Sequence, residues 1–478
     1  MTKRITRREG LLAGLFGTGY IGLRALATGL PAWYLLNPRR ATAQDLQCAI
    51  TARDSMQYLI LSASSNGDPL NCNVPGTYEA PEIIHPEQTS MEKVTVTLGG
   101  KTYGAALPWA DPTVMSPTDM AMGVAAPATG RLSSAVLART AFIHHRTATT
   151  VHGDQPKVMK LLGDMSGNEM IISSYAKHLS TCFGTVQAAP IAIGARGNAS
   201  ELVSFAGRTL PSISPTQLKQ LLTGSGRDSA STALVSLRAL RDQSLDALNA
   251  MAKADGSTVQ KQFLDKLATS QTQVRGLAAQ LGTTLDAITS DDVNGQALAA
   301  AALFQANVTP VVTVRIAFGG DNHTDAALQA EADQHVSGVA GIQTMMNAMA
   351  TAGLADKVTF ATMNVFGRNL SGIAKVTSRT GRDHYGNHSV MVLIGKNVRP
   401  GVYGGVVASG TTGAFAAGDI DAATGALTTG GDITAVKTHV SAARTLGAAL
   451  GLPDAVVAGD YVASAGGKVI TAAVTPPA

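Results

Sequence analysis

Four short, almost continuously apolar runs constrain the fold of this chain more than any other feature. They cover residues 57–63, 311–318, 358–363 and 389–394. Apolar residues at successive positions predict strands that are buried on both faces, as in a mainly parallel sheet covered by helices on both sides. The sequence therefore predicts an α/β fold with a mainly parallel central sheet flanked by helices.

The segment between the second and third runs has the spacing of an amphipathic helix. It begins near Asp325, and its apolar residues fall on one stripe, at Leu328, Ala332, Val336, Val339, Ile342, Met346 and Met349. A strand, a helix and a strand of these lengths predict one βαβ crossover. His335 lies beside the stripe, and we interpret it as a core histidine with a hydrogen-bond partner rather than a metal ligand.

Residues 212–300 have a helical pattern of their own. Two apolar stripes, at 234–251 and 259–281, are separated by Asp-Gly-Ser at 255–257, where Ser257 can cap the second helix. This pattern predicts an antiparallel helical hairpin that is inserted into the α/β domain and packs on it.

The remaining chain is divided around this insertion. We expect residues 44–211 and 301–405 to form the two parts of the α/β domain. A Gly/Ala/Thr-rich segment follows at 406–478, with one helix predicted near 436–450 and a short hairpin at its end.

The first 43 residues have the pattern of an export signal. Four basic residues between Lys3 and Arg8 precede a glycine-diluted apolar run at 11–23, and Ala-Thr-Ala at 41–43 fits a signal peptidase site. The run is short for a membrane-spanning helix of about 20 residues. The apolar residues 33–36 extend it, however, and leave open the alternative that the segment is retained as a membrane anchor. The Arg7-Arg8 pair resembles a twin-arginine signal, which implies a folded periplasmic or secreted protein without a membrane span in its mature chain.

Charge and cysteine content exclude some partners and sites. The net charge is only +4 and the basic residues form no stripe, which argues against nucleic acid. The three cysteines lack the spacing of a zinc knuckle. Cys48 and Cys72 either pair in an oxidising compartment or remain unpaired small hydrophobic residues.

Residues of the types that bind metals gather at the ends of the predicted strands. Six of the ten histidines lie in three short segments: His144, His145 and His152, then His323, then His384 and His388. Ligands in such sheets gather at the carboxyl ends of the strands, and imidazole and carboxylate groups bind divalent cations. We therefore expect a zinc, manganese or calcium site formed by Asp68, Asp321, His323, Asp383, His384 and His388. In the alternative, Asp321 caps a helix and the histidines are surface or core residues.

Four motifs in this order resemble domain-of-unknown-function family 1501. They are Gly-Gly-Asp-Asn-His at 319–323, Phe-Gly-Arg at 366–368, Gly-Arg-Asp-His at 381–384 and Val-Tyr-Gly-Gly at 402–405. That family consists largely of twin-arginine-exported proteins and is similar to the alkaline phosphatase and sulfatase superfamily. The resemblance implies an alkaline phosphatase-like fold and metal-dependent hydrolysis of a small phosphate or sulfate ester, or binding of a cell-envelope component. In a hydrolase of this type, Arg368 would contact an anionic oxygen with its planar guanidinium. In the alternative, Arg368 is a structural partner of a buried carboxylate.

The chain departs from the family pattern at two functional positions. Val365 stands where the family usually has Glu before Phe-Gly-Arg. At the start of the predicted helix at 152–163, where superfamily relatives place their nucleophile, there is no hydroxyl or thiol. Thr150 and its neighbour Thr149 are the nearest candidates, with residues 64 and 65 as weaker ones. The resemblance thus leaves two functions open: a metal-dependent hydrolase, and a catalytically silent secreted binding or assembly protein.

Overall fold

The computed structural model describes most of the chain after the predicted signal. The described residues are 48, 56–123, 130–182, 189–194, 203–205, 208–210, 212–223, 232–371, 381–409, 414–461 and 466–475. The predicted export signal at residues 1–43 lies outside them. Among the described helices, none combines the length and the apolar character needed to cross a lipid bilayer.

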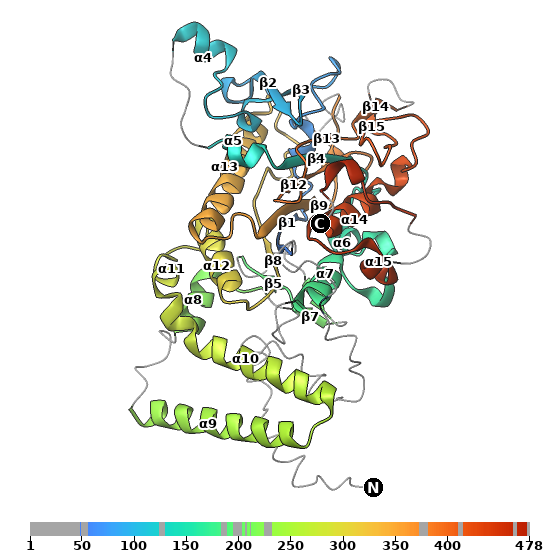
Figure 1. Cartoon of the computed structure of the whole chain (residues 1–478). Helices are drawn as coiled ribbons and strands as arrows, with labels where there is room; N and C mark the ends of the chain where they lie inside the picture. Colours follow the sequence, from blue (N-terminus) through green and yellow to red (C-terminus); the bar gives the residue numbers. More distant parts are fainter. Residues whose placement is uncertain are drawn as a thin grey trace, which may run out of the picture.

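A seven-stranded sheet lies at the centre of the molecule, in the order β13-β4-β12-β9-β1-β8-β5 (Figure 1). Its strands are β1 (Tyr58–Ser64), β4 (Thr140–His145), β5 (Ile191–Ala192), β8 (Val311–Val314), β9 (Val358–Asn364), β12 (Ser389–Ile394) and β13 (Gly401–Tyr403). β12 is antiparallel to both of its neighbours, whereas the other pairs are parallel. The predicted α/β fold with a mainly parallel sheet is confirmed.

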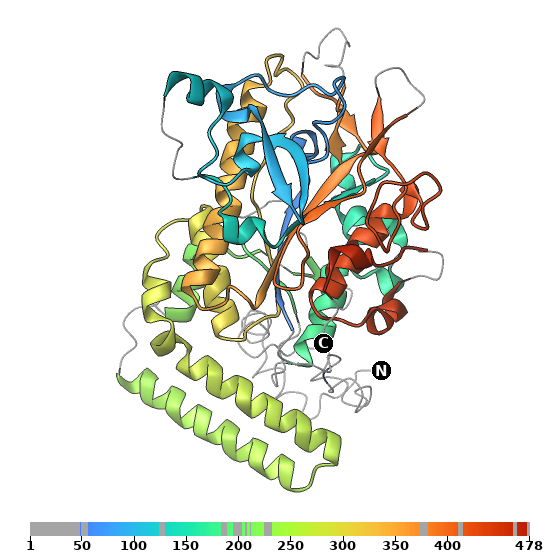
Figure 2. The same cartoon turned by 45° about the horizontal axis from the view of Figure 1, so that its top comes forward.

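Alternate residues of the central strands pack into two cores on opposite faces of the sheet. On β1, Ile60 packs in the core that contains α12 (Val293–Gln305) and α13 (Gln329–Thr351). Leu59 and Leu61 pack in the core that contains α7 (Ile171–Ser180) and α14 (Thr438–Ala449), and Figures 1 and 2 show these helix pairs on either side of the sheet. Burying each large aliphatic side chain stabilises the fold by about 1.5–3 kcal/mol. Burial on both faces is therefore the reason that the strands are apolar at successive positions.

The predicted βαβ crossover is formed by β8, α13 and β9. Both strands are parallel to β1, which lies between them. The helix begins at Gln329, a few residues later than expected, because Leu328 has a left-handed backbone (φ 53°) that cannot continue a helix. His335 is buried and its Nε2 accepts a hydrogen bond from Nε1 of Trp109 at 2.7 Å. Its interpretation as a core histidine is confirmed.

The helical hairpin is present, but it projects from the body of the molecule. α9 (Thr232–Ala254) and α10 (Thr258–Gln280) run antiparallel, with α8 (Pro215–Thr223) and α11 (Gly282–Asp286) at their base (Figures 1 and 2). Leu248 and Met251, which we expected to face a core, are 60% and 69% exposed. Contrary to the expectation that it packs on the α/β domain, the hairpin contacts that domain mainly at its base, and α12, assigned to the insertion by sequence, belongs to the core beside α13.

The smaller elements surround the sheet. Two-stranded pairs are formed by β2 (Lys93–Leu98) with β3 (Lys101–Ala106), β6 (Val203–Phe205) with β7 (Arg208–Leu210), β10 (Gly367–Arg368) with β11 (His384–Tyr385), and β14 (Val406–Ala408) with β15 (Phe415–Ala417). Short helices are α4 (Pro117–Met122), α5 (Ser134–Leu137), α6 (Gln155–Met159) and α15 (Asp454–Val457). The predicted helix at 436–450 is α14, whereas the described residues 466–475 contain a 3-10 turn at Thr471–Ala473 and no hairpin.

One disulfide joins the start of the described chain to the end of α7. Cys48 is bonded to Cys182, not to Cys72. The thiol of Cys72 is free and buried in a small cluster with Ile83 and Leu370. The pairing of Cys48 with Cys72 that the sequence left open is therefore excluded.

Candidate metal centre

Four chain segments that are far apart in sequence meet at one edge of the sheet. Because β12 is antiparallel to β4 and β9, its first residue lies at the edge where those strands end, and Ser389 pairs with His145 at the end of β4. The segments after β4, β8 and β9 and the segment before β12 therefore converge. They carry His152, Asp321 with His323, Arg368, and His384.

Three histidine rings direct their Nε2 atoms at the carboxylate of Asp321. Nε2 of His323 and Nε2 of His384 lie 2.7 Å and 3.0 Å from Oδ1, and Nε2 of His152 lies 3.5 Å from Oδ2. The Nε2 atoms of His323 and His384 are 2.9 Å apart. Within the described residues, one group of three or more potential ligands has all its ligand atoms within 4.8 Å of one another, and it consists of His152, Asp321 and His384.

Backbone carbonyl groups determine which nitrogen of each ring carries hydrogen. Nδ1 of His152 lies 2.7 Å from the carbonyl oxygen of Ser65, Nδ1 of His323 3.0 Å from that of Arg382, and Nδ1 of His384 2.8 Å from that of Thr150. A carbonyl oxygen only accepts hydrogen bonds, so each Nδ1 must donate. When such a ring is neutral, its Nε2 carries a lone pair that points at Asp321.

This arrangement fits a divalent cation. Lone pairs of three imidazole rings and a carboxylate repel one another unless a proton or a cation lies between them. Metal-binding histidines commonly donate their other ring N–H to a carbonyl or carboxylate group, which fixes the tautomer and the ring orientation. Imidazole ligands favour zinc over manganese and calcium, which are better suited to oxygen ligands.

Arg368 anchors Asp321 and does not face the open side of the site. Its buried guanidinium donates to Oδ1 of Asp321 at 3.0 Å and to the carbonyl oxygens of Asn66 and Gly320. Partial burial raises the pKa of Asp321, but the contact with His384, the hydrogen bond from Arg368 and the positive charge of Arg368 outweigh this effect and lower it to about 2. The carboxylate is therefore ionised at neutral pH. The structure gives Arg368 a positioning contact, where the family resemblance implied contact with a substrate oxygen.

The other predicted site residues lie behind the centre or outside it. Oδ1 of Asp383 is 3.7 Å from Nδ1 of His323, on the side of the ring away from Asp321. Asp68 is buried, with the backbone N–H of Phe318 directed at its Oδ2, and burial raises the pKa of Asp68 to about 6. His388 is buried, with Nε2 2.9 Å from Nδ1 of His144. Thr150 takes part through its carbonyl oxygen, which orients His384.

His152 is the site residue that our sequence reasoning did not assign. It follows β4, a strand whose short apolar core at residues 141–143 we did not recognise. The signal was available, because His152 belongs to one of the three histidine segments of the sequence. The ring of Phe366 packs against His152 and His384, with centroid distances of 5.0 and 4.4 Å, and forms an apolar wall of the site.

Comparison with known proteins identifies the family. The model of a family described as "Protein of unknown function (DUF1501)" matches residues 167–426. This chain belongs to that family. The matched segment of the family contains Asp321, His323, Arg368 and His384, whereas His152 lies before it. No curated protein matches the chain.

Proposed function

We propose that this protein is an exported metal-dependent hydrolase of the alkaline phosphatase and sulfatase type. It binds one divalent ion, preferably zinc, at His152, Asp321 and His384, with His323 beside them. The observation that carries this proposal is the convergence of Nε2 atoms on an ionised carboxylate, with each Nδ1 bonded to a backbone carbonyl.

The partial exposure of the ligands supports a catalytic rather than a closed structural site. The side chains of His152 and Asp321 are 39% and 48% exposed, so solvent reaches one side of the centre. Catalytic zinc sites commonly have three protein ligands and an open position, and zinc there would polarise an ester oxygen or activate water. Phe366 shields the opposite side. The hydroxyl of Thr149 donates to Asp154, which leaves the hydroxyl of Thr150 as the candidate nucleophile of this segment.

A catalytically silent metal-binding protein is the second candidate, and two observations favour it. His152 stands at the helix start where superfamily relatives place a nucleophile. Val365, which replaces the family's usual Glu, is fully buried in the core beside α7 and α14 and brings no carboxylate to the site.

The disulfide supports the export part of the proposal. Disulfides persist in oxidising compartments outside the cytoplasm, and Cys48 lies four residues after Gln44, the expected first residue of the mature chain. We expect replacement of Arg7 and Arg8 by Lys to retain the precursor in the cytoplasm, as fractionation would show. Normal export of this variant would contradict the twin-arginine assignment.

Metal analysis and an ester-hydrolysis screen of matched variants test the function. We expect about one equivalent of metal in the wild type and much less in His152→Ala and His384→Ala. His178→Ala is the control, because His178 also pairs with a carboxylate, that of Asp460 at 2.8 Å, but lies outside the site.

The screen separates the two candidates. Turnover of a phosphate or sulfate ester by the wild type and by His178→Ala, abolished in His384→Ala, would establish the hydrolase. Metal binding without turnover in any variant would favour the silent protein. A wild type that binds none of zinc, manganese and calcium would refute the metal centre.

A further inference from the structure

A buried ion pair lies directly behind the candidate metal centre. Nε of Arg382 is 2.7 Å from Oε2 of Glu331, and the two side chains are 3% and 1% exposed. Glu331 lies in the first turn of α13. Arg382 lies two residues before His384, the first residue of β11. Neither charged side chain belongs to the metal-binding group, so the pair needs an explanation of its own.

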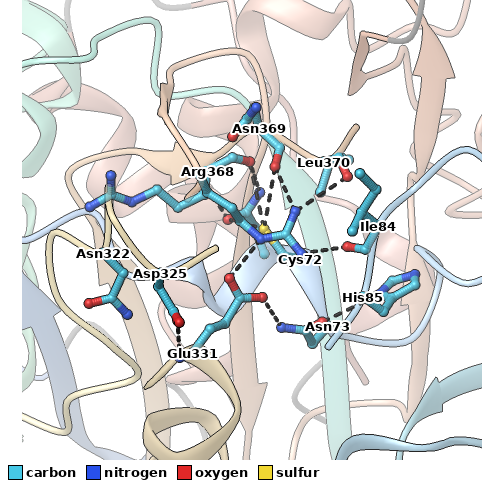
Figure 3. Close-up of polar contacts among 12 residues, drawn as sticks. Cys72, Asn73, Ile84, His85, Asn322, Asp325, Glu331, Arg368, Asn369 and Leu370 are labelled. Atoms are coloured by element: carbon cyan, nitrogen blue, oxygen red, sulfur yellow. Dashed lines mark hydrogen bonds and ion pairs between the residues drawn. The ribbon is translucent and has the colours of Figure 1, made fainter. Parts of the chain in front are cut away.

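Additional partners hold both charged groups in place. The guanidinium of Arg382 donates to the carbonyl oxygen of Asn369 at 2.9 Å and to that of Ile84. The second carboxylate oxygen of Glu331 accepts a hydrogen bond from Nδ2 of Asn73 at 2.7 Å. Figure 3 shows Glu331, Asn73, Ile84 and Asn369 grouped around this network. The pair therefore joins the start of α13 to three other segments of the chain.

The backbone next to Arg382 orients residues of the metal centre. Its carbonyl oxygen accepts the hydrogen bond from Nδ1 of His323 at 3.0 Å. The preceding residue, Gly381, donates its N–H to the carbonyl oxygen of His323 at 2.7 Å. The next residue, Asp383, donates its N–H to Oδ1 of Asn369 at 2.7 Å. The backbone that accepts the hydrogen bond from His323 and leads into His384 therefore belongs to the residue whose guanidinium forms the buried ion pair.

Stability alone does not account for such a pair. Buried ion pairs can often be replaced by apolar residues of similar volume with little loss, or even a gain, in stability. Groups that orient metal ligands, in contrast, commonly change metal affinity by 10- to 100-fold when they are replaced. We propose that Arg382 and Glu331 are positioning residues of the metal centre, which hold His323 and His384 in the geometry that binds the ion. This inference rests on the proposed function, since it requires that the centre binds metal.

Metal affinity tests the inference apart from folding. We would measure the affinity for zinc and cobalt by competition with a chromophoric chelator, together with the absorption spectrum of the cobalt form. Glu331→Gln, which removes the charge and keeps the shape, is expected to weaken binding by about 10- to 100-fold and to change the cobalt spectrum. The double variant Arg382→Met with Glu331→Met is expected to recover much of the thermal stability lost in Glu331→Gln but not the affinity.

A second ion pair provides the control. Asp454→Asn breaks a bidentate pair with Arg444 that lies outside the site. It is expected to lower the melting temperature without changing the affinity or the spectrum. If Glu331→Gln does not fold, Asn73→Ala replaces it. This change removes one hydrogen bond to Glu331 and one to His85 but leaves both charges of the pair in place, and a several-fold loss of affinity is expected.

The outcomes distinguish this inference from the proposed function. If the wild type binds neither ion, the metal centre itself is wrong and the positioning role is refuted with it. The positioning role is overturned if the wild type binds metal and the variants bind it equally tightly with an unchanged cobalt spectrum. The variants compared are the double variant and one single variant, Glu331→Gln or Asn73→Ala. In that case the metal centre itself stands.

Discussion

The disulfide between Cys48 and Cys182 provides a prediction whose magnitude follows from chain length. The two cysteines are 134 residues apart in the sequence. In the chain-entropy model, a cross-link that closes a loop of this length removes enough freedom from the unfolded chain to stabilise the native state by about 5 kcal/mol. Removal of native disulfides typically costs about 2–5 kcal/mol. We therefore expect Cys48→Ser to lower the free energy of unfolding by about 2–5 kcal/mol.

Guanidinium-induced unfolding with and without a reducing agent measures this effect. The wild type should lose the same free energy of unfolding on reduction as Cys48→Ser loses by substitution. Cys48→Ser itself should be insensitive to the reducing agent, since Cys72 forms no disulfide. The variant is also expected to retain metal, because neither bonded cysteine belongs to the metal-binding group.

Thiol titration of the unfolded protein tests the premise independently. The oxidised chain should show one reactive thiol, that of Cys72, and the reduced chain all three. Three thiols in protein purified from an oxidising compartment would show that the bond does not form. Equal stability of the oxidised and reduced protein, with the bond present, would refute the argument from loop length.

Three further predictions concern buried and exposed positions. Val365 is fully buried in an apolar core, so Val365→Glu should lower the free energy of unfolding, measured by chemical denaturation, by several kcal/mol and should not add a metal ligand. A variant with wild-type stability and increased metal affinity would show instead that the position faces a solvated pocket. Burial and the charge of His85 lower the pKa of His335 to about 3, so its contribution to stability is complete above pH 6.5 and is lost as the pH falls toward 3. The free energy of unfolding, measured at several pH values, should therefore depend less on pH in His335→Gln than in the wild type. An unchanged pH dependence would contradict this role of His335. Leu248→Lys and Met251→Lys on α9 should each change the free energy of unfolding by less than about 0.5 kcal/mol, and a larger loss would mean that this face is covered in solution.

Local patterns in the sequence were sufficient for the elements of the fold. Strands buried on both faces need apolar residues at successive positions, so the runs that became β1, β8, β9 and β12 were recognisable without knowledge of their partners. The amphipathic spacing of α13 and the break between α9 and α10 depend only on nearby residues in the same way. Exposure was harder to predict, because the apolar stripe of α9 has the same spacing whether or not a partner covers it.

The candidate site was only partly accessible from sequence. Asp321, His323 and His384 could be selected because they adjoin recognisable strands. Asp68 and His388 satisfy the same criterion, yet both side chains are buried in the interior, where Asp68 contacts the backbone N–H of Phe318 and His388 contacts His144. Position at the end of a strand does not specify the direction of a side chain. That direction depends on what packs against each face of the strand.

The sequence by itself determined the α/β class, the crossover through α13, the family, and the chain segments that carry metal-binding residue types. Only the tertiary structure decided that His152 joins Asp321 and His384, that Arg368 and Arg382 lie behind the site, and that Cys48 pairs with Cys182. The physical reason is the range of the interactions. Hydrophobic periodicity acts between near neighbours in the chain, whereas the site depends on the reversed direction of β12 between β4 and β9. That pairing brings residues more than 150 positions apart to one edge of the sheet, and it results from the packing of the whole chain.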